Sequence, residues 1–580
     1  MLMEKKNFLQ RIFTGRKGRR LREHLTAYIF IAPATILIFI FGIFPVGFAL
    51  YVSLHKWRIK RSSMIGLTNY VNAIGSLAYV LVFFLGLGAL IGVYFLLKRV
   101  IKMARENEDQ PWLCILPGLF HGALVFSLLN WIYHLLPEVL GIADKLRGQD
   151  RTQAVFMRLL GEAFTAESVL PSFWLFLLLL LIGIGIGIGV SKIWRNRRNA
   201  TYQAYFGLSF LALGASAGLI YYTFQQVFAA YEAAFAEGID PGIWPQFISI
   251  ASGVILLALA WILWQSAQKQ LKAHRFWLYL LAAGVLLVGG WLLVGEIPTI
   301  VASGDQDLWE GLKVTVFFSL GTVPFQLIIS LFLSVLLFQK LRGSNVFRII
   351  YFIPYVTPAI ASAVVFQQMF SNRESAPVNM LLKGMNNIVT FICDHSNDFV
   401  NSLIGWIRFE PQQWLFEPRG ILEIIGESFG WNLPEWAAGP SLALVVILLH
   451  SIWTYVGYDT VIYLAGLGNI SPELYDAAEV DGANKWQVFR FITFPLLSPS
   501  TYFLSLIAII GTFKAFNTIW IFRSNLALGT TDTFSVTIFV EFFDKLRYGY
   551  ASALSFILFA IILVLSYINN KTQGSKVFYG

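Results

Sequence analysis

The sequence predicts an all-α polytopic membrane protein. Its 580 residues are 57% apolar and only 13% charged, and apolar runs of membrane-crossing length recur along the chain. Little polar sequence remains between these runs, which excludes a large soluble domain. Counting the runs gives twelve expected spans, near residues 26–53, 77–97, 112–136, 169–191, 203–230, 246–265, 275–297, 311–338, 345–370, 441–467, 496–522 and 549–569.

The basic residues indicate how these spans are oriented. With the N-terminus inside, most clusters of Lys and Arg fall on one side of the membrane, as the positive-inside rule requires. Both termini are therefore expected in the cytoplasm, and the formal net charge of +10 is expected to face anionic lipid rather than nucleic acid. One loop is an exception to this rule. It follows the first span and is expected outside, yet it carries four basic residues, Lys56, Arg58, Lys60 and Arg61.

The first span follows a basic cytoplasmic N-terminus, residues 1–24. It is too long for a signal peptide and lacks a convincing cleavage site, so we expect it to remain as an anchor. Cys114 falls within a span and Cys393 in an outer loop. We expect neither a disulfide nor a metal site from two cysteines so placed.

A polar stretch at residues 471–495 separates two apolar runs in the C-terminal half. Ser471 and Pro472 predict a helix start, because Ser suits the N-cap and Pro the first helical position. Gly482 is expected to interrupt this helix, Asn484 to cap a second one, and Pro495 to stop it. The pattern predicts two short helices joined at a glycine bend.

This stretch resembles the EAA loop of the membrane subunits of ABC importers. The resemblance rests on six positions at the spacing of that motif, with Asp in place of Glu and Phe494 in place of Leu: Asp476, Ala477, Ala478, Gly482, Ile492 and Pro495. In that family the loop docks on a cytoplasmic ATPase, so the resemblance implies ATPase coupling for these residues. The alternative is an amphipathic helix on the membrane surface.

Further motifs resemble the carbohydrate-uptake branch of the same family. They include Gly66-Leu67-Thr68-Asn69-Tyr70, Leu308-Trp309-Glu310-Gly311-Leu312-Lys313, Trp453 with Gly457, and Leu464-Ala465-Gly466-Leu467. The resemblance covers about residues 25–75 and 305–570 and implies a six-helix type I permease core plus about six additional spans. The expected domains are 1–24, a first core span and outer loop at 25–75, an inserted six-span region at 76–304, and a core at 305–580 that contains the outer loop 371–440 and the coupling loop 471–495.

The insertion is rich in small residues. Its Gly-x-x-x-Gly pairs predict close helix packing: Gly183 with Gly187, Gly185 with Gly189, and Gly214 with Gly218. It also repeats part of the EAA spacing around Glu232 and Gly238, without the final Leu-Pro. We interpret that repeat as coincidence, the alternative being a degenerate second permease unit.

Two spans that bracket the coupling loop combine aromatic rings with amide and hydroxyl groups. Rings stack on the C–H faces of a sugar, and polar groups replace water on its hydroxyls. We expect these residues to line the substrate path, although helix packing explains any single one of them almost as well: Trp453, Tyr455, Tyr458, Thr512, Phe513, Phe516 and Asn517. The sequence does not say which sugar is carried, or whether the cargo is a polyol or a glycerophosphate.

No catalytic set is visible, and no P-loop is present in the sequence. We expect no cofactor on this chain, with ATP and Mg²⁺ held by a partner. The resemblance implies a non-enzymatic permease in the plasma (inner) membrane of a prokaryote. Its implied partners are a second permease subunit, two copies of an ABC ATPase, an extracellular solute-binding protein and membrane lipid. Two alternatives remain: a twelve-span secondary transporter and a polytopic membrane enzyme such as a glycosyltransferase.

Overall fold

A computed structural model describes most of the chain. The described residues are 15–148, 150, 152–194, 198–238, 240–268, 274–339, 343–395, 411–428, 430–431, 433–434 and 437–574. They form helices joined by short loops and one two-stranded sheet, so the expected all-α class is confirmed. Most of the predicted N-terminal segment 1–24 and part of the predicted outer loop 371–440 lie outside the described residues.

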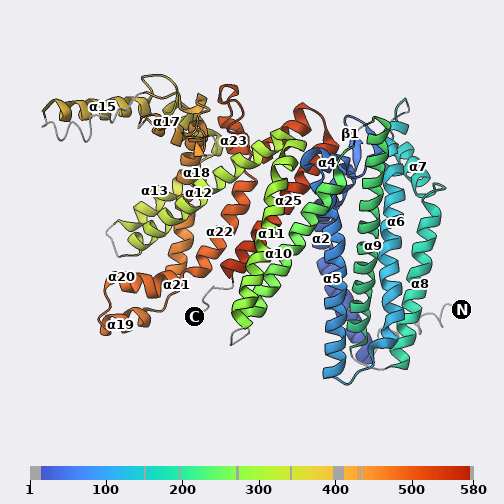
Figure 1. Cartoon of the computed structure of the whole chain (residues 1–580). Coiled ribbons are helices and arrows are strands. Elements are labelled where there is room, and N and C mark those ends of the chain that lie inside the picture. Colours follow the sequence, from blue (N-terminus) through green and yellow to red (C-terminus); the bar gives the residue numbers. More distant parts are fainter. Residues whose placement is uncertain are drawn as a thin grey trace. The chain divides into compact units, whose positions relative to one another are not determined.

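The chain divides into two compact units, coloured by sequence in Figure 1. Unit 1 consists of Met1–Gly75 and Val301–Gly580, and unit 2 of Ser76–Ile300. The helices and strands that begin in unit 2 are α5 (Leu77–Glu106), η2 (Pro111–Cys114), α6 (Ile115–Lys145), α7 (Gln153–Phe164), α8 (Leu170–Ile193), α9 (Asn199–Ala236), α10 (Ile243–Gln268) and α11 (His274–Ser303).

Unit 1 opens with a long helix and a hairpin, and the rest of the bundle follows unit 2 in sequence. Its elements are α2 (Gly15–Ile38), η1 (Phe39–Ile43), α3 (Phe44–Ser53), β1 (His55–Trp57), β2 (Arg61–Met64), α4 (Thr68–Ile74), α12 (Gln306–Phe338), α13 (Ser344–Val356), α14 (Ala359–Met369), α15 (Pro377–His395), η3 (Trp414–Phe416), α17 (Ile421–Ser428), α18 (Leu442–Gly468), α19 (Pro472–Val480), α20 (Lys485–Val488), η5 (Phe489–Thr493), α21 (Phe494–Leu496), α22 (Ser498–Phe513), α23 (Asn517–Phe522), η6 (Asn525–Ala527), α24 (Phe534–Phe539), η7 (Val540–Asp544) and α25 (Tyr548–Thr572).

Ten helices among the described residues are long and apolar enough to cross a membrane. Two bent pairs raise the count to 12 if each pair is one span. The first pair, Val346–Val356 with Ala359–Met369, bends by 95°, and the second, Lys485–Leu496 with Ser498–Phe513, bends by 60°. The ten helices and the first bent pair overlap eleven of the twelve predicted spans, whereas only Ser498–Phe513 of the second pair falls within the predicted span 496–522. The ninth span is sharply bent at Thr357 and Pro358, where helical hydrogen bonding lapses.

The predicted eleventh span, residues 496–522, is broken rather than continuous. Helix α22 ends at Phe513, and a new helix, α23, begins at Asn517. The carbonyl groups released by the break are satisfied from another segment, because the hydroxyls of Ser535 and Thr533 donate to the carbonyls of Phe513 and Ala515, each at 3.1 Å. Non-helical backbone survives at membrane depth only where protein or water supplies such partners.

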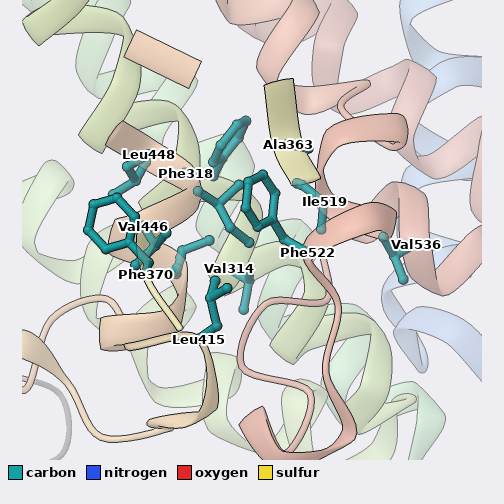
Figure 2. Packing of buried hydrophobic residues seen from close by; sticks show 12 residues of the cluster. Val314, Phe318, Ala363, Phe370, Leu415, Val446, Leu448, Ile519, Phe522 and Val536 are labelled. Atoms are coloured by element: carbon teal, nitrogen blue, oxygen red, sulfur yellow. The ribbon is translucent and has the colours of Figure 1, made fainter. Parts of the chain in front are cut away.

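The core of unit 1 lies where α12, α14, α18, α23 and α24 meet. Figure 2 shows its apolar side chains, which include Phe318 and Phe522. Gly457 of α18 lets another backbone come close, because a Cβ there would overlap the carbonyl oxygen of Tyr351 in α13. The glycine of the predicted Trp-x-x-x-Gly motif is therefore a helix-packing residue.

The two sequence segments of unit 1 are joined by a backbone hydrogen bond. Within the first segment, the Asn69 side chain donates to the carbonyls of Ser53 and His55, at 2.7 and 3.1 Å. The backbone N–H of Asp305 donates to the carbonyl of Ala73 at 3.1 Å. The chain thus leaves unit 1 and returns to it at neighbouring points.

Glycines bring helices together in unit 2, but only some of the predicted ones. A Cβ at Gly183 would lie 3.6 Å from Phe120, and one at Gly187 would lie 3.4 Å from Gln203. Gly185, Gly189 and Gly218 face no atom within 4 Å, so their predicted packing role is wrong within this chain. Residues two apart on a helix point in nearly opposite directions, which explains why the overlapping pairs differ. The closest α6–α9 approach instead uses Gly118 and Gly207.

Candidate functional site

The loop between α18 and α22 forms a defined helix–turn–helix. Pro472 starts α19, with Ser471 at the N-cap in an extended conformation. Gly482 closes the helix with φ of 74°, a left-handed conformation that glycine adopts without steric cost. Asn484 then caps α20 in a capping box: its Oδ1 accepts from the Gln487 N–H at 2.9 Å, and Gln487 Oε1 accepts from the Asn484 N–H at 2.7 Å. The expected helix–bend–helix is present.

The second helix does not stop at Pro495, which corrects the sequence-based expectation. It continues from Lys485 through a π-helical turn, Phe489–Thr493, to Leu496. Pro495 has no N–H to donate, and it sits at an early position of α21, where that loss costs little. The direction changes only at Leu497, where the helix bends by 60° into α22.

The residues of the EAA resemblance lie on this element, with different exposure. Asp476, Ala477 and Gly482 are exposed, Ala478 is buried, and Ile492 and Pro495 are half-buried. No atom of this chain lies within 4 Å of a Cβ built at Gly482. The helix–turn–helix thus presents an open surface at the glycine, as a docking loop requires.

Large apolar side chains accompany that open surface. Val480 and Trp486 are 88% and 68% exposed, although both belong to a short, well-capped element. Four carboxylates and two cationic groups share these helices: Glu473, Asp476, Glu479, Asp481, Lys485 and Arg490. An acidic rim around exposed apolar side chains is typical of a protein interface.

The polar candidates for the substrate path gather at the break between α22 and α23. Thr512 donates from its hydroxyl to Ser319 Oγ in α12 at 2.9 Å and is buried. Phe513 is also buried, and Phe516 packs against Phe539, with ring centroids 4.6 Å apart. Asn517 is exposed at the start of α23. The break therefore combines hydroxyl, amide and aromatic groups at a point where the backbone leaves helical geometry.

The candidates on α18 have other neighbours. Tyr458 stacks on Tyr355 of α13 with centroids 4.7 Å apart, and Tyr455 lies 6.0 Å from the same ring. Trp453 lies 5.2 Å from Phe366 of α14. Among the described residues no hydrogen bond or ring contact joins these aromatic rings to Thr512 or Asn517, so a common cavity stays a prediction.

The sequence analysis did not identify a row of buried polar side chains on α12. Its members recur every three or four residues: Thr315, Ser319, Thr322, Gln326, Ser330 and Ser334. Ser330 donates to the Val456 carbonyl of α18 at 3.0 Å, and the Thr315 hydroxyl accepts from the Phe534 N–H at 2.9 Å. The signal was available as helical periodicity of Ser, Thr and Gln within an apolar run.

Two ionisable side chains of α18 are also buried. His450 is paired through Nε2 with the Ser362 hydroxyl at 3.0 Å. Asp459 is 4% exposed, and its Oδ2 has no hydrogen-bond partner in the described part of the chain. Lys514 is exposed beyond the end of α22. Charged groups at membrane depth are expensive, so the buried Asp459 carboxylate makes this part of α18 a candidate functional region.

Comparison with known proteins identifies the part of the chain that carries these features. Residues 326–571 match the family described as binding-protein-dependent transport system inner membrane component. That range contains the helix–turn–helix, the α22–α23 break and all of α18.

Individual relatives match the same share of the chain. The lactose transport system permease protein LacF of Rhizobium radiobacter is 28% identical over 46% of this chain and 75% of its own length. The arabinooligosaccharides transport system permease protein AraP of Bacillus subtilis is 26% identical over 46% and 71%. The trehalose/maltose transport system permease protein MalF of Thermococcus litoralis is 26% identical over 46% and 75%. A crystal structure of a bacterial ABC transporter that imports alginate is 20% identical over 47% of this chain and 80% of that chain, with a TM-score of 0.35.

Proposed function

Because the chain belongs, through residues 326–571, to the family of binding-protein-dependent transport system inner membrane components, we propose that it is the permease subunit of an ATP-driven sugar importer. The observation that carries the proposal is the open helix–turn–helix at Gly482, which lies inside the matched region. The relatives named above, permeases for lactose, arabinooligosaccharides and trehalose/maltose, support a carbohydrate cargo.

Energy for transport comes, in this proposal, from a separate ATPase. The sequence contains no P-loop, so this chain does not supply nucleotide binding of that type. The surface around Gly482 offers exposed Val480 and Trp486 within an acidic rim. That chemistry fits a groove with an apolar floor and basic edges. We assign ATPase docking to α19 and α20.

Substitution of Gly482 tests the docking surface. Gly482→Asp adds volume and charge at a point that is open in this chain, so loss of the ATPase would come from a clash with the partner. Gly482→Asn adds similar volume without charge and tolerates the left-handed turn. We expect both variants to insert normally, and to lose co-purification of the ATPase and substrate-stimulated ATP hydrolysis in membranes.

Two controls separate docking from backbone strain. Gly529 has φ of 77° and equally open surroundings, but lies in the loop between α23 and α24, so Gly529→Asp should leave the ATPase bound. Asp476→Lys should weaken assembly less than Gly482→Asp, because a rim charge contributes at most about 1 kcal/mol. Wild-type co-purification and hydrolysis in both Gly482 variants would make α19 and α20 a surface element unrelated to coupling.

The substrate path is proposed to run past α18 and the α22–α23 break. Hydroxyl, amide and ring groups at Tyr458, Thr512 and Asn517 are the types that bind sugars. We expect Tyr458→Ala and Asn517→Ala to reduce uptake while the assembled complex persists. Tyr221→Ala, which removes an exposed ring of unit 2, is the matched control. Unchanged uptake in both path variants would remove these residues from the route.

The remaining partners follow from the same family. We propose that an extracellular solute-binding protein delivers the sugar, that a second permease subunit completes the pathway, and that two ATPase copies assemble with the pair. Both termini are placed in the cytoplasm by the charge pattern. Purification of the complex from the native membrane, followed by mass analysis of its chains, tests these partners together.

A further inference from the structure

Helix α15 is amphipathic, yet the described part of the chain leaves its apolar face exposed. The exposed apolar side chains recur at helical spacing and are each between 38% and 68% exposed: Met380, Leu381, Met385, Ile388, Phe391 and Ile392. Lys383, Asn387, Thr390 and Asp394 occupy the opposite side. With 19 residues α15 is long enough to cross a membrane, but it is too polar to be one of the candidate spans. It resembles a helix that lies along an apolar boundary.

The chain fixes the start of α15 to the end of α14, the second helix of the bent pair. Helix α14 ends at Met369, and α15 begins at Pro377. Fully buried Asn379 stabilises the connection. Its Nδ2 donates to the carbonyls of Ser371, Arg373 and Gln412, at 3.3, 3.0 and 3.3 Å, and its Oδ1 accepts from the N–H groups of Gln412 and Trp414, at 3.1 and 2.7 Å. The first turn of α15 is therefore held at the C-terminal end of α14.

The apolar face of α15 starts against the bundle. Val378, which lies on the same side of the helix as Met385, packs against the apolar core of unit 1 beside Trp414. Beyond that turn the helix runs outward past α17, as Figure 1 shows. The face that contacts the bundle core thus continues, without a break in its chemistry, into the exposed residues.

We propose that residues 380–392 of α15 lie in the membrane–water interface, with the apolar face among the lipid acyl chains and Lys383 toward water. A soluble partner that dissociates would leave six large apolar side chains exposed to water between encounters, whereas lipid is always present at this depth. The Lys383 ammonium pairs with the Glu374 carboxylate at 2.5 Å. A lysine can place its apolar stem along the lipid and its charged end among the headgroups. The helix then anchors the outer edge of α14 and α18 in the bilayer plane.

Site-directed spin labelling tests this placement on the full chain. The half-buried thiol of Cys393 is first removed by Cys393→Ser, while Cys114 has no exposed surface and is left in place. Single variants Leu381→Cys, Met385→Cys, Ile388→Cys and Ile392→Cys sample the apolar face, and Lys383→Cys, Asn387→Cys and Thr390→Cys sample the polar face. Each is labelled with a nitroxide and reconstituted in phosphatidylethanolamine–phosphatidylglycerol liposomes. Power saturation compares accessibility to oxygen, which dissolves in lipid, with accessibility to a water-soluble nickel chelate.

The ratio of oxygen to nickel accessibility should oscillate with a period of about 3.6 residues and peak on the apolar face. A label at Leu85, an exposed site in the middle of α5, gives the reference for a lipid-facing position. High nickel accessibility on both faces would place α15 in water. Exclusion of both reagents from the apolar face would mean that protein covers it. Either result overturns the proposal, and seven positions prevent one misfolded variant from deciding the outcome.

Discussion

Units 1 and 2 pack apolar helices by different means. In unit 1 α12 buries a row of hydroxyl and amide side chains, and several of them bond to other segments, as Ser330 does to α18 and Ser319 does to Thr512 of α22. In unit 2 the buried hydroxyls of Ser209 and Thr223 bond to carbonyls of their own helix, although Asn130 of α6 donates to the buried Ser172 of α8 at 3.2 Å, and glycines such as Gly118 make the closest contacts. Burying polar groups between membrane helices is costly unless they are paired, so the bonds to α18, α22 and α24 stabilise the row on α12.

The two units differ in their relation to the family match. The row on α12 straddles the start of that match at residues 326–571, with Thr315, Ser319 and Thr322 before it and Gln326, Ser330 and Ser334 inside it. Unit 2 lies outside the match, and its His121 lies at the α6–α9 contact beside Gly207. The substrate path that we propose therefore lies in unit 1.

The largest expected effect is at the closest backbone contact of unit 1. A methyl group at Gly457 would overlap the Tyr351 carbonyl, a backbone atom that cannot rotate away. We expect Gly457→Ala to destabilise the protein by about 3 kcal/mol, the upper end of typical overpacking costs. Thermal unfolding of detergent-purified protein measures the change. Gly185→Ala in unit 2 has open space and serves as the control; equal midpoints for the two variants would refute close α13–α18 packing.

A smaller difference should separate interhelical from intrahelical hydroxyls. Ser330→Ala removes a bond to the Val456 carbonyl of α18 as well as one to the Gln326 carbonyl of its own helix. We expect it to cost about 0.6 kcal/mol, the average for side-chain hydrogen bonds between membrane helices, and at most about 1.7 kcal/mol. Ser209→Ala, at a similarly buried site in unit 2, removes only a bond to the Tyr205 carbonyl of its own helix and should cost less. The thermal unfolding midpoints of the two variants measure these costs. A larger cost for Ser209→Ala than for Ser330→Ala would contradict the difference between interhelical and intrahelical hydroxyls.

The smallest effect is a pH response outside the membrane spans. Hydrogen bonds from Arg419, the nearest at 2.9 Å, lower the pKa of Glu417 below its ordinary value of 4.5. A lowered folded-state pKa means that the stabilisation is present above pH 4.5 and is lost as the pH falls through the folded pKa. Because Arg419 is 45% exposed, solvent screening limits the contribution to below about 1 kcal/mol.

Melting curves at pH 6 and pH 3.5 would reveal this contribution. Glu417→Gln should reduce the loss of stability on acidification. Glu423→Gln changes a more distant carboxylate near Arg419, so this variant should still lose most of the stability that the wild type loses. The pair also joins the outer loop to α18, since the Glu417 and Arg419 carbonyls accept from the N–H groups of Ala443 and Leu442. An identical acid response in wild type and Glu417→Gln would exclude the ion pair as its source.

Local sequence signals predicted the long apolar helices of unit 1 and the helix–turn–helix between α18 and α22. Apolar run length located the spans, and Pro472, Gly482 and Asn484 located α19 and α20, because caps and left-handed turns depend on residues within one or two turns. The same reasoning failed at Pro495, which was expected to stop a helix. Its missing N–H falls in a turn where that donor is not needed.

Long-range partners explain what the sequence did not reveal. The break after Phe513 is stabilised by hydroxyls about twenty residues further along the chain, and Thr512 bonds to Ser319 from a distant helix. Hydropathy sums contain no information on such pairs. The seven candidate path residues were likewise chosen by type, and the structure places those on α18 and those at the break beside different neighbours.

The hydrogen bond between Asp305 and Ala73 has a consequence for the modularity of the chain. The chain leaves unit 1 after Gly75 and returns to it at Val301. Because Ala73 and Asp305 are hydrogen-bonded, the two ends of the inserted segment 76–300 are attached to neighbouring points of unit 1. The six candidate spans of the inserted segment are even in number, so removal would leave every later helix with the same polarity across the bilayer. A gene for unit 1 alone, with a short linker from Gly75 to Val301, would encode the helices of unit 1 in the same order and with the same connections.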